Sequence, residues 1–307
     1  MKIEKVAIIG LGAIGAFVAS KLSSVIREEN LVIIADGERK SKLEKGLVIN
    51  GKPYQFQIVT PQECDEVADL VIIATKYQGL QQAIKDIKNR VGEHTVIMSL
   101  LNGVSSEEVL QATYGKKVIY SLMRLSSIRT EEGIFFNDHN GYIEFGEANN
   151  EVMSKRVLAI KKLFDEAHIQ SRIPLDMKKA LWHKYACNVA ENQSSAILGI
   201  PFGAWQVSET ANHLREMAMK EVFAVAAKKG IIFTEEDLMT QRQRLSHVPY
   251  GNKTSMLQDI ENKRETEVEM FAGEMIAMGK EVGVPTPINL IFYDAIKILE
   301  EKNKGII

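Results

Sequence analysis

The chain has 307 residues, of which 45% are hydrophobic and 25% charged, and its formal net charge is −2. These values are typical of a globular protein of roughly two domains, and they exclude the basic field that binds nucleic acid. No apolar run reaches the length of about 18 residues that predicts a membrane span. The two cysteines, Cys64 and Cys187, predict no disulfide framework, so we expect reduced thiols and a cytoplasmic protein.

The chain begins with an apolar run, residues 6–9, that leads into the glycine pattern G-x-G-x-x-G. The run predicts a buried strand, and residues 13–27 predict the helix that follows. In this context the first glycine permits a tight turn, the second lets a pyrophosphate approach the backbone, and the third lets helix and strand pack closely. An ordinary glycine turn is the alternative. We therefore expect a dinucleotide-binding site at Gly10, Leu11, Gly12, Ala13, Ile14 and Gly15.

The next apolar run, residues 31–35, ends at Asp36, at about the distance beyond the glycines where an acid binds the ribose of NADH. A carboxylate there would repel the 2′-phosphate of NADPH. Arg39, Lys40 and Lys42 follow, however, and would suit that phosphate. The alternative is that Asp36 only caps the next helix and the basic side chains are solvated, so the sequence leaves the coenzyme open.

Two further buried strands are expected over residues 68–75 and 95–101, after a hairpin around Asn50-Gly51. Lys76 and Asn102 follow the carboxyl ends of these two strands. Ligands of open α/β sheets bind beyond such ends, which predicts that both residues lie near the coenzyme. The alternatives are a solvated lysine and an Asn-Gly turn.

Residues 117–173 predict a strand, an antiparallel meander over 126–145 with a turn at 138–141, a helix over 152–168 and a closing strand. After Pro174 strand patterns almost vanish and helical periodicity takes over. The sequence thus predicts an α/β protein with an N-terminal Rossmann dinucleotide-binding domain, residues 1–173, and an all-helical C-terminal domain, residues 174–307. Its helices are expected over residues 177–198, 209–230, 235–245, 264–282 and 287–300.

The helix over 177–198 is mostly apolar but carries Lys184, Asn188 and Asn192 at i, i+4 and i+8. This spacing places a cation and two amides on one face, where burial would demand partners. A solvent stripe or a polar seam between domains is the alternative. A second polar cluster holds Ser255, which could cap a helix, and Glu267, which taken singly is most simply a surface carboxylate.

Taken together, these motifs resemble the ketopantoate reductase family over nearly the whole chain. The resemblance rests on the glycine pattern and on four further motifs: Thr75-Lys76, Leu101-Asn102-Gly103, Trp182-x-Lys184-x-x-x-Asn188-x-x-x-Asn192, and Ser255-Met256-Leu257-Gln258-Asp259 with Arg264-x-Thr266-Glu267. The last two are the specific ones, because the glycine pattern occurs in many dehydrogenases.

The resemblance implies the NADPH-dependent reduction of 2-dehydropantoate, a 2-keto acid, in pantothenate and coenzyme A biosynthesis. It makes Lys184 the catalytic general acid and Glu267 the carboxylate that orients substrate and lysine. It assigns Asn188, Asn192 and Ser255 to substrate binding, and Lys76 and Asn102 to the coenzyme–substrate junction. No metal ligand, nucleic acid or membrane is implied, and the apolar helical half is compatible with a homodimer.

Two positions depart from the family pattern. The family usually has an Asn-Gly pair shortly after the lysine helix, whereas this chain reads Ile200-Pro201-Phe202-Gly203. It also often has an arginine where Asp36 stands, so NADH is possible here. Two alternatives therefore stand beside ketopantoate reduction: a reductase of the same architecture for another 2-keto acid, and a nucleotide-sensing protein without catalysis.

Overall fold

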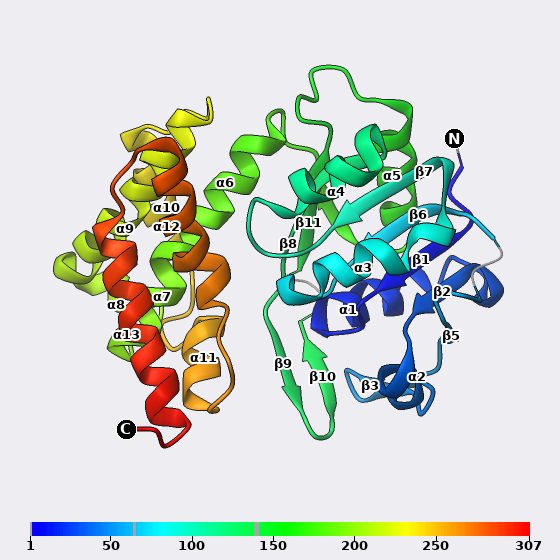
Figure 1. Cartoon of the computed structure of the whole chain (residues 1–307), viewed down its shortest axis with the longest axis horizontal. Coiled ribbons are helices and arrows are strands. Elements are labelled where there is room, and N and C mark those ends of the chain that lie inside the picture. Colours follow the sequence, from blue (N-terminus) through cyan, green and yellow to red (C-terminus); the bar gives the residue numbers. More distant parts are fainter. Residues whose placement is uncertain (1, 64–65, 138–140) are drawn as a thin grey trace. The chain divides into compact units, whose positions relative to one another are not determined.

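The computed structural model describes residues 2–63, 66–137 and 141–307 (Figure 1). The chain separates into two compact units, Met1–Leu181 and Trp182–Ile307, and the division between them falls within the helix Met177–Cys187. Cys64 and most of the turn expected over 138–141 lie outside the described residues.

The first unit alternates strands and helices, as predicted. Its strands are β1 (Val6–Ile9), β2 (Leu31–Ile34), β3 (Leu47–Ile49), β4 (Lys52–Tyr54), β5 (Gln57–Val59), β6 (Ala68–Ile73), β7 (Val91–Ser99), β8 (Val118–Arg124), β9 (Ser127–Thr130), β10 (Gly133–Phe136), β11 (Tyr142–Gly146) and β12 (Gln170–Arg172). Its α-helices are α1 (Ala13–Leu22), α2 (Gly37–Leu43), α3 (Leu80–Asp86), α4 (Ser106–Tyr114) and α5 (Lys155–Glu166), with short 3-10 turns η1 (Glu28–Asn30), η2 (Tyr77–Gly79), η3 (Lys88–Arg90) and η4 (Gly115–Lys117).

An eight-stranded sheet forms the centre of this unit, in the order β12-β11-β8-β7-β6-β1-β2-β5. The strands from β8 to β5 are parallel to their neighbours, and β11 joins antiparallel to β8. The carboxyl ends of β1, β2, β6 and β7 therefore lie along one edge of the sheet, which is where ligands bind in such folds.

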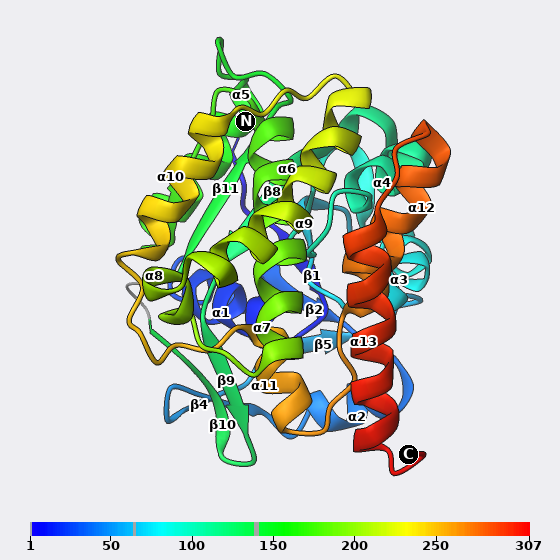
Figure 2. The ribbon, with the colours of Figure 1, turned by 90° about the vertical axis from the view of Figure 1, so that its left-hand side faces the viewer.

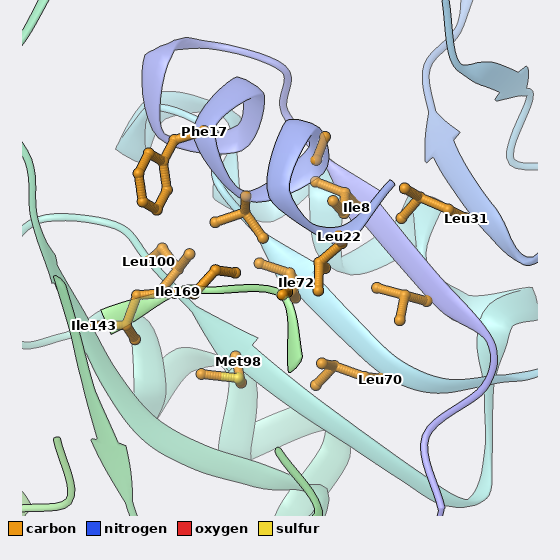
Figure 3. Close-up of a cluster of buried hydrophobic side chains, with 14 of the residues drawn as sticks. Ile8, Phe17, Leu22, Leu31, Leu70, Ile72, Met98, Leu100, Ile143 and Ile169 are labelled. Atoms are coloured by element: carbon orange, nitrogen blue, oxygen red, sulfur yellow. The ribbon is translucent and has the colours of Figure 1, made fainter. Parts of the chain in front are cut away.

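Both faces of the sheet are covered because its central strands are apolar on both sides. On one face Ile8 belongs to a buried cluster with Phe17 and Leu22 of α1 (Figure 3). The same cluster includes residues of α5. On the other face Ala7 and Ile9 pack with residues of α3 and α4. Alternate residues of β1 thus enter two separate cores, as the period of two along a strand requires.

A second, four-stranded sheet has the order β4-β3-β10-β9. The predicted hairpin at Asn50-Gly51 is confirmed, because β3 and β4 pair antiparallel around it. The predicted three-strand meander is wrong in its last strand. β9 and β10 form a hairpin, but Tyr142–Gly146 leaves it and pairs with β8 of the large sheet.

The second unit is helical (Figure 2). Helix α6 (Met177–Cys187), which the unit boundary crosses, leads into the π-turn η5 (Asn188–Asn192). The elements that follow are α7 (Gln193–Leu198), α8 (Ala204–Val207), α9 (Glu209–Lys228), α10 (Glu235–Leu245), α11 (Ser255–Glu261), the π-turn η6 (Glu269–Gly273), α12 (Glu274–Val282) and α13 (Pro287–Asn303). The predicted α/β fold class with a helical C-terminal half is thus confirmed, but the helix expected over 264–282 begins later and contains a π-turn.

Candidate functional site

The three glycines of the G-x-G-x-x-G pattern meet two different demands. Gly10 has φ +94°, and a Cβ there would lie 2.5 Å from the carbonyl carbon of Ala74. A Cβ on Gly15 would lie 1.9 Å from the carbonyl oxygen of Gly10, so helix and strand could not pack. At Gly12 no heavy atom lies within 4 Å of the Cβ position. The turn therefore offers open space at the position where a pyrophosphate would approach the backbone.

The amino end of α1 suits an anion. Gly12 is its N-cap and supplies no side-chain cap, and the first turn, which includes Ala13 and Ile14, holds no acidic residue. Its positive dipole end is therefore not compensated by the helix itself. Leu11, by contrast, is buried and serves the core. The chain's own residues thus fit the diphosphate of a dinucleotide.

Asp36 follows β2 and is exposed at the carboxyl edge of the sheet. Its Oδ1 accepts a hydrogen bond of 2.7 Å from the amide of Gly37, so it caps α2, as one alternative held. A carboxylate has a second oxygen, so capping leaves an acceptor for ribose hydroxyls.

Lys40 and Lys42, two of the basic residues after Asp36, have carboxylates nearby. Lys40 lies 3.1 Å from Glu44, whose hydrogen bond raises the pKa of the lysine, and Lys42 lies 4.0 Å from Glu38. Both ammonium groups are therefore already partly balanced by carboxylates.

Lys76 and Asn102 follow the neighbouring parallel strands β6 and β7. Lys76 is exposed at the start of η2, and Asn102 is half-buried before α4. Both lie beyond carboxyl ends of the sheet, as expected. Their contact with coenzyme and substrate stays a prediction.

Lys184, Asn188 and Asn192 lie along the segment formed by α6 and η5. Lys184 is only 7% exposed and Asn192 only 8%, so the solvent-stripe alternative is wrong for these two. The amide of Asn192 donates to Oδ1 of Asn188 at 3.3 Å. A π-turn has more residues per turn than an α-turn, so it rotates Asn192 back toward the line of the preceding residues. The sequence did not predict this turn.

Ser255 joins the same group of side chains. Its hydroxyl donates to Oδ1 of Asn192 at 3.0 Å. The predicted capping role is wrong, because the neighbouring Thr254 is the N-cap of α11 and its hydroxyl accepts from the amide of Leu257. The structure therefore brings three predicted substrate-binding residues, Ser255, Asn192 and Asn188, into one hydrogen-bonded row within the second unit.

The backbone around Glu267 is held on both sides. The buried carboxylate of Glu300 accepts from the amide and the hydroxyl of Thr266 at 2.9 and 2.8 Å. Burial alone would raise the pKa of Glu300, but the hydrogen bonds from Thr266 and the nearby ammonium of Lys297 together outweigh it, and the pKa lies below its usual value. On the other side, the carbonyl of Glu267 accepts from the amides of Met270 and Phe271 at 3.0 and 3.1 Å.

A buried ionic network behind η5 was not predicted. Arg215, on α9, is fully buried, and its guanidinium lies 3.4 Å from Glu191 and 3.0 Å from Glu216. Gln241, on α10, donates to the same oxygen of Glu191 at 2.8 Å. Glu191 lies between Asn188 and Asn192, so the network fixes the turn that carries both amides. Glu191 lies 24 residues before Arg215 in the sequence, so no local pattern predicted their pairing.

Phe202, where the family pattern has an amide, packs edge-on against the ring of Trp205 with centroids 5.4 Å apart. Its backbone amide donates to the carbonyl of Asn252 at 2.8 Å. The position thus carries an aromatic ring in place of a hydrogen-bonding side chain.

Two kinds of feature are absent from the described part of the chain. No described helix combines the length and apolar character needed to cross a lipid bilayer. Within 2–63, 66–137 and 141–307, no three His, Cys, Asp or Glu side chains are grouped so that they could hold a metal ion.

The family follows from comparison with known proteins. Residues 6–150 match the model described as ketopantoate reductase PanE/ApbA, and residues 176–300 match that for its C-terminal part. The chain belongs to the ketopantoate reductase family. It is therefore an oxidoreductase of that family, and the glycine turn and the polar row belong to the two halves that the family models describe.

Relatives in this family extend over the whole chain. The uncharacterized oxidoreductase YkpB of Bacillus subtilis is 27% identical, covering 95% of this chain and 100% of its own. The 2-dehydropantoate 2-reductase of Archaeoglobus fulgidus is 26% identical over 98% and 99% of the two chains. Among solved structures, a D-mandelate dehydrogenase in complex with NADH has a TM-score of 0.83 at 22% identity, covering 97% of this chain and 99% of its own, which shows a shared fold.

Proposed function

We propose that the protein reduces a 2-keto acid to the 2-hydroxy acid with a nicotinamide coenzyme, and that ketopantoate is its substrate. The observation that carries the proposal is the row of Ser255, Asn192 and Asn188 in the same unit as the buried Lys184. Hydroxyl and amide groups are what a carboxylate and a hydroxyl of a small substrate require. The 2-dehydropantoate 2-reductases among the relatives support this choice.

The coenzyme, when bound, supplies the hydride that reaches the keto carbon. Negative charge then develops on the ketone oxygen. Lys184 stabilises that charge and donates its proton to the oxygen, completing the alcohol. Glu267 orients the ammonium group and the substrate. The row of Ser255, Asn192 and Asn188 holds the remaining polar groups of the substrate.

The test is oxidation of NADH and of NADPH, followed at the nicotinamide absorbance, with ketopantoate and a panel of other 2-keto acids. Turnover with ketopantoate exceeding that with every other acid supports the proposal. Failure of ketopantoate while an aromatic keto acid reacts would favour the second candidate, a reductase for another 2-keto acid. The ring of Phe202 in place of an amide is the observation behind that candidate. If neither coenzyme is oxidised with any of these acids, the remaining candidate is the nucleotide-sensing protein without catalysis.

For the coenzyme, we propose NADH in preference to the NADPH that the family resemblance implies, because Asp36 presents a carboxylate at the ribose position. Asp36→Asn removes the charge and keeps a residue that caps helices well. We expect kcat/KM with NADPH to rise relative to NADH by about tenfold, as the loss of one charge contact predicts. Glu28→Gln, which changes an exposed carboxylate in η1, before the amino end of β2, is the control and should leave the ratio unchanged. An unaltered ratio in Asp36→Asn would contradict the coenzyme assignment.

Glu267→Gln should mainly weaken the use of the 2-keto acid. Removing the charge of a hydrogen-bonded carboxylate predicts a loss of about 10–100-fold in kcat/KM, expressed chiefly in KM. Glu265→Gln, which changes an exposed carboxylate two residues earlier, should behave like the unmodified protein. Steady-state kinetics at fixed coenzyme concentration distinguishes the two variants. Equal kinetic constants for both would remove Glu267 from the mechanism.

The homodimer suggested by the sequence stays a prediction, which light scattering on the purified protein would test.

A further inference from the structure

Two π-turns lie in the second unit, and each is close in sequence to proposed site residues. η5 spans Asn188–Asn192 and contains both amides, and η6 spans Glu269–Gly273 and starts two residues after Glu267. The two turns pack against each other. π-turns are rare and are frequently found at functional sites. Contacts between the two turns therefore affect where the proposed site residues lie.

Tyr185 connects the segment before one turn to the backbone of the other. It directly follows Lys184 on α6, and its side chain is 1% exposed. Its hydroxyl lies 3.1 Å from the carbonyl oxygen of Met270 and 2.9 Å from that of Phe271, both in η6. A phenol has one proton, so it shares the donor between two acceptors.

The same two residues carry the contact onward to Glu267. The amides of Met270 and Phe271 donate to the carbonyl of Glu267 at 3.0 and 3.1 Å. Met270 and Phe271 are themselves buried, so water does not reach their carbonyl groups. These carbonyls therefore require hydrogen-bond donors from the protein. A continuous path of hydrogen bonds thus runs from the residue beside Lys184 to the backbone of Glu267.

We propose that Tyr185 is a positioning residue, whose hydroxyl holds η6 and thereby sets where Glu267 lies relative to Lys184. The inference rests on the proposed function, in which these two side chains act on one substrate. When the hydroxyl of Tyr185 is removed, two carbonyl groups of η6 lose their hydrogen bond from α6. Glu267 then orients the 2-keto acid less well, while Lys184 keeps its ability to donate a proton.

The test is Tyr185→Phe, which removes one oxygen atom and keeps the ring. We expect KM for the accepted 2-keto acid to rise by about tenfold, the factor that corresponds to one lost hydrogen bond, with a smaller change in kcat. Backbone amide exchange, measured without substrate, should become faster at Met270 and Phe271. A merely structural role would lower the melting temperature and leave KM unchanged.

Tyr114→Phe is the matched control. Tyr114, on α4 in the first unit, also donates its phenol proton to a backbone carbonyl, that of Ile84 at 2.6 Å. The variant Tyr114→Phe should be less stable than the unmodified protein, with the same KM and the same rate of backbone amide exchange in η6. The inference is overturned if Tyr185→Phe retains the KM of the unmodified protein, or if exchange at η6 stays the same. If the unmodified protein reduces no 2-keto acid, the proposed function fails, and the exchange experiment still decides whether Tyr185 holds η6.

Discussion

Lys184→Met is expected to lower kcat by about 10²–10⁴-fold, because general acid assistance to a reacting group is typically of that size. Methionine fills similar volume in this buried position but carries neither charge nor proton. Coenzyme affinity should be unchanged, since the glycine turn belongs to the other unit. Turnover with the accepted 2-keto acid and the fluorescence titration of NADH measure the two quantities separately.

The control for this variant is Lys178→Met, which removes an exposed lysine from the same helix. It should turn over substrate at the rate of the unmodified protein. Near-normal kcat in Lys184→Met would rule out the general acid role, and the enzymatic proposal would then need another proton donor.

Arg215→Met should strongly destabilise the second unit. Removing one partner of a buried ion pair costs about 3–5 kcal/mol, because the remaining charge stays buried without compensation. Glu191 would lose its cationic partner, while Glu216 would retain its ion pair with Arg242. We expect the melting temperature to fall by about 10 °C.

Lys253→Met provides the comparison, because it removes an exposed ion pair with Glu261 whose contribution is about 0–1 kcal/mol. The double variant Glu191→Gln with Arg215→Met should recover part of the lost stability, since it also removes the buried negative charge that Arg215 had balanced. Thermal unfolding of the three variants provides the measurement. Equal melting temperatures for Arg215→Met and Lys253→Met would show that the network contributes little.

Local chemistry made much of the first unit predictable. The glycine pattern, the apolar runs of β1, β2 and β6, and the Asn50-Gly51 hairpin each depend on a few neighbouring residues. Pairing between distant strands does not. Tyr142–Gly146 has the alternation of a meander strand, yet it pairs with β8, because the choice of partner depends on tertiary packing.

In the second unit the sequence predicted the residue types of the site but not the turns that carry them. Thr254 and Ser255 are adjacent hydroxyl residues, and only the extended backbone at Thr254 decides which one is the cap. The π-turn η5 is held by Arg215 and Gln241, which lie far along the chain. No local pattern encodes such contacts, so the helix containing Asn188 and Asn192 was expected to be regular.

The contrast among the three glycines bears on how this chain could diverge. Gly10 and Gly15 are required by the fold, since a methyl group at either would collide with main-chain atoms. Gly12 faces free space, so no contact within the fold requires it, and only the close approach of a pyrophosphate would select glycine there. In a descendant that no longer bound a nucleotide, we expect substitutions at position 12 first. Gly10 and Gly15 would be retained, because the fold still requires them.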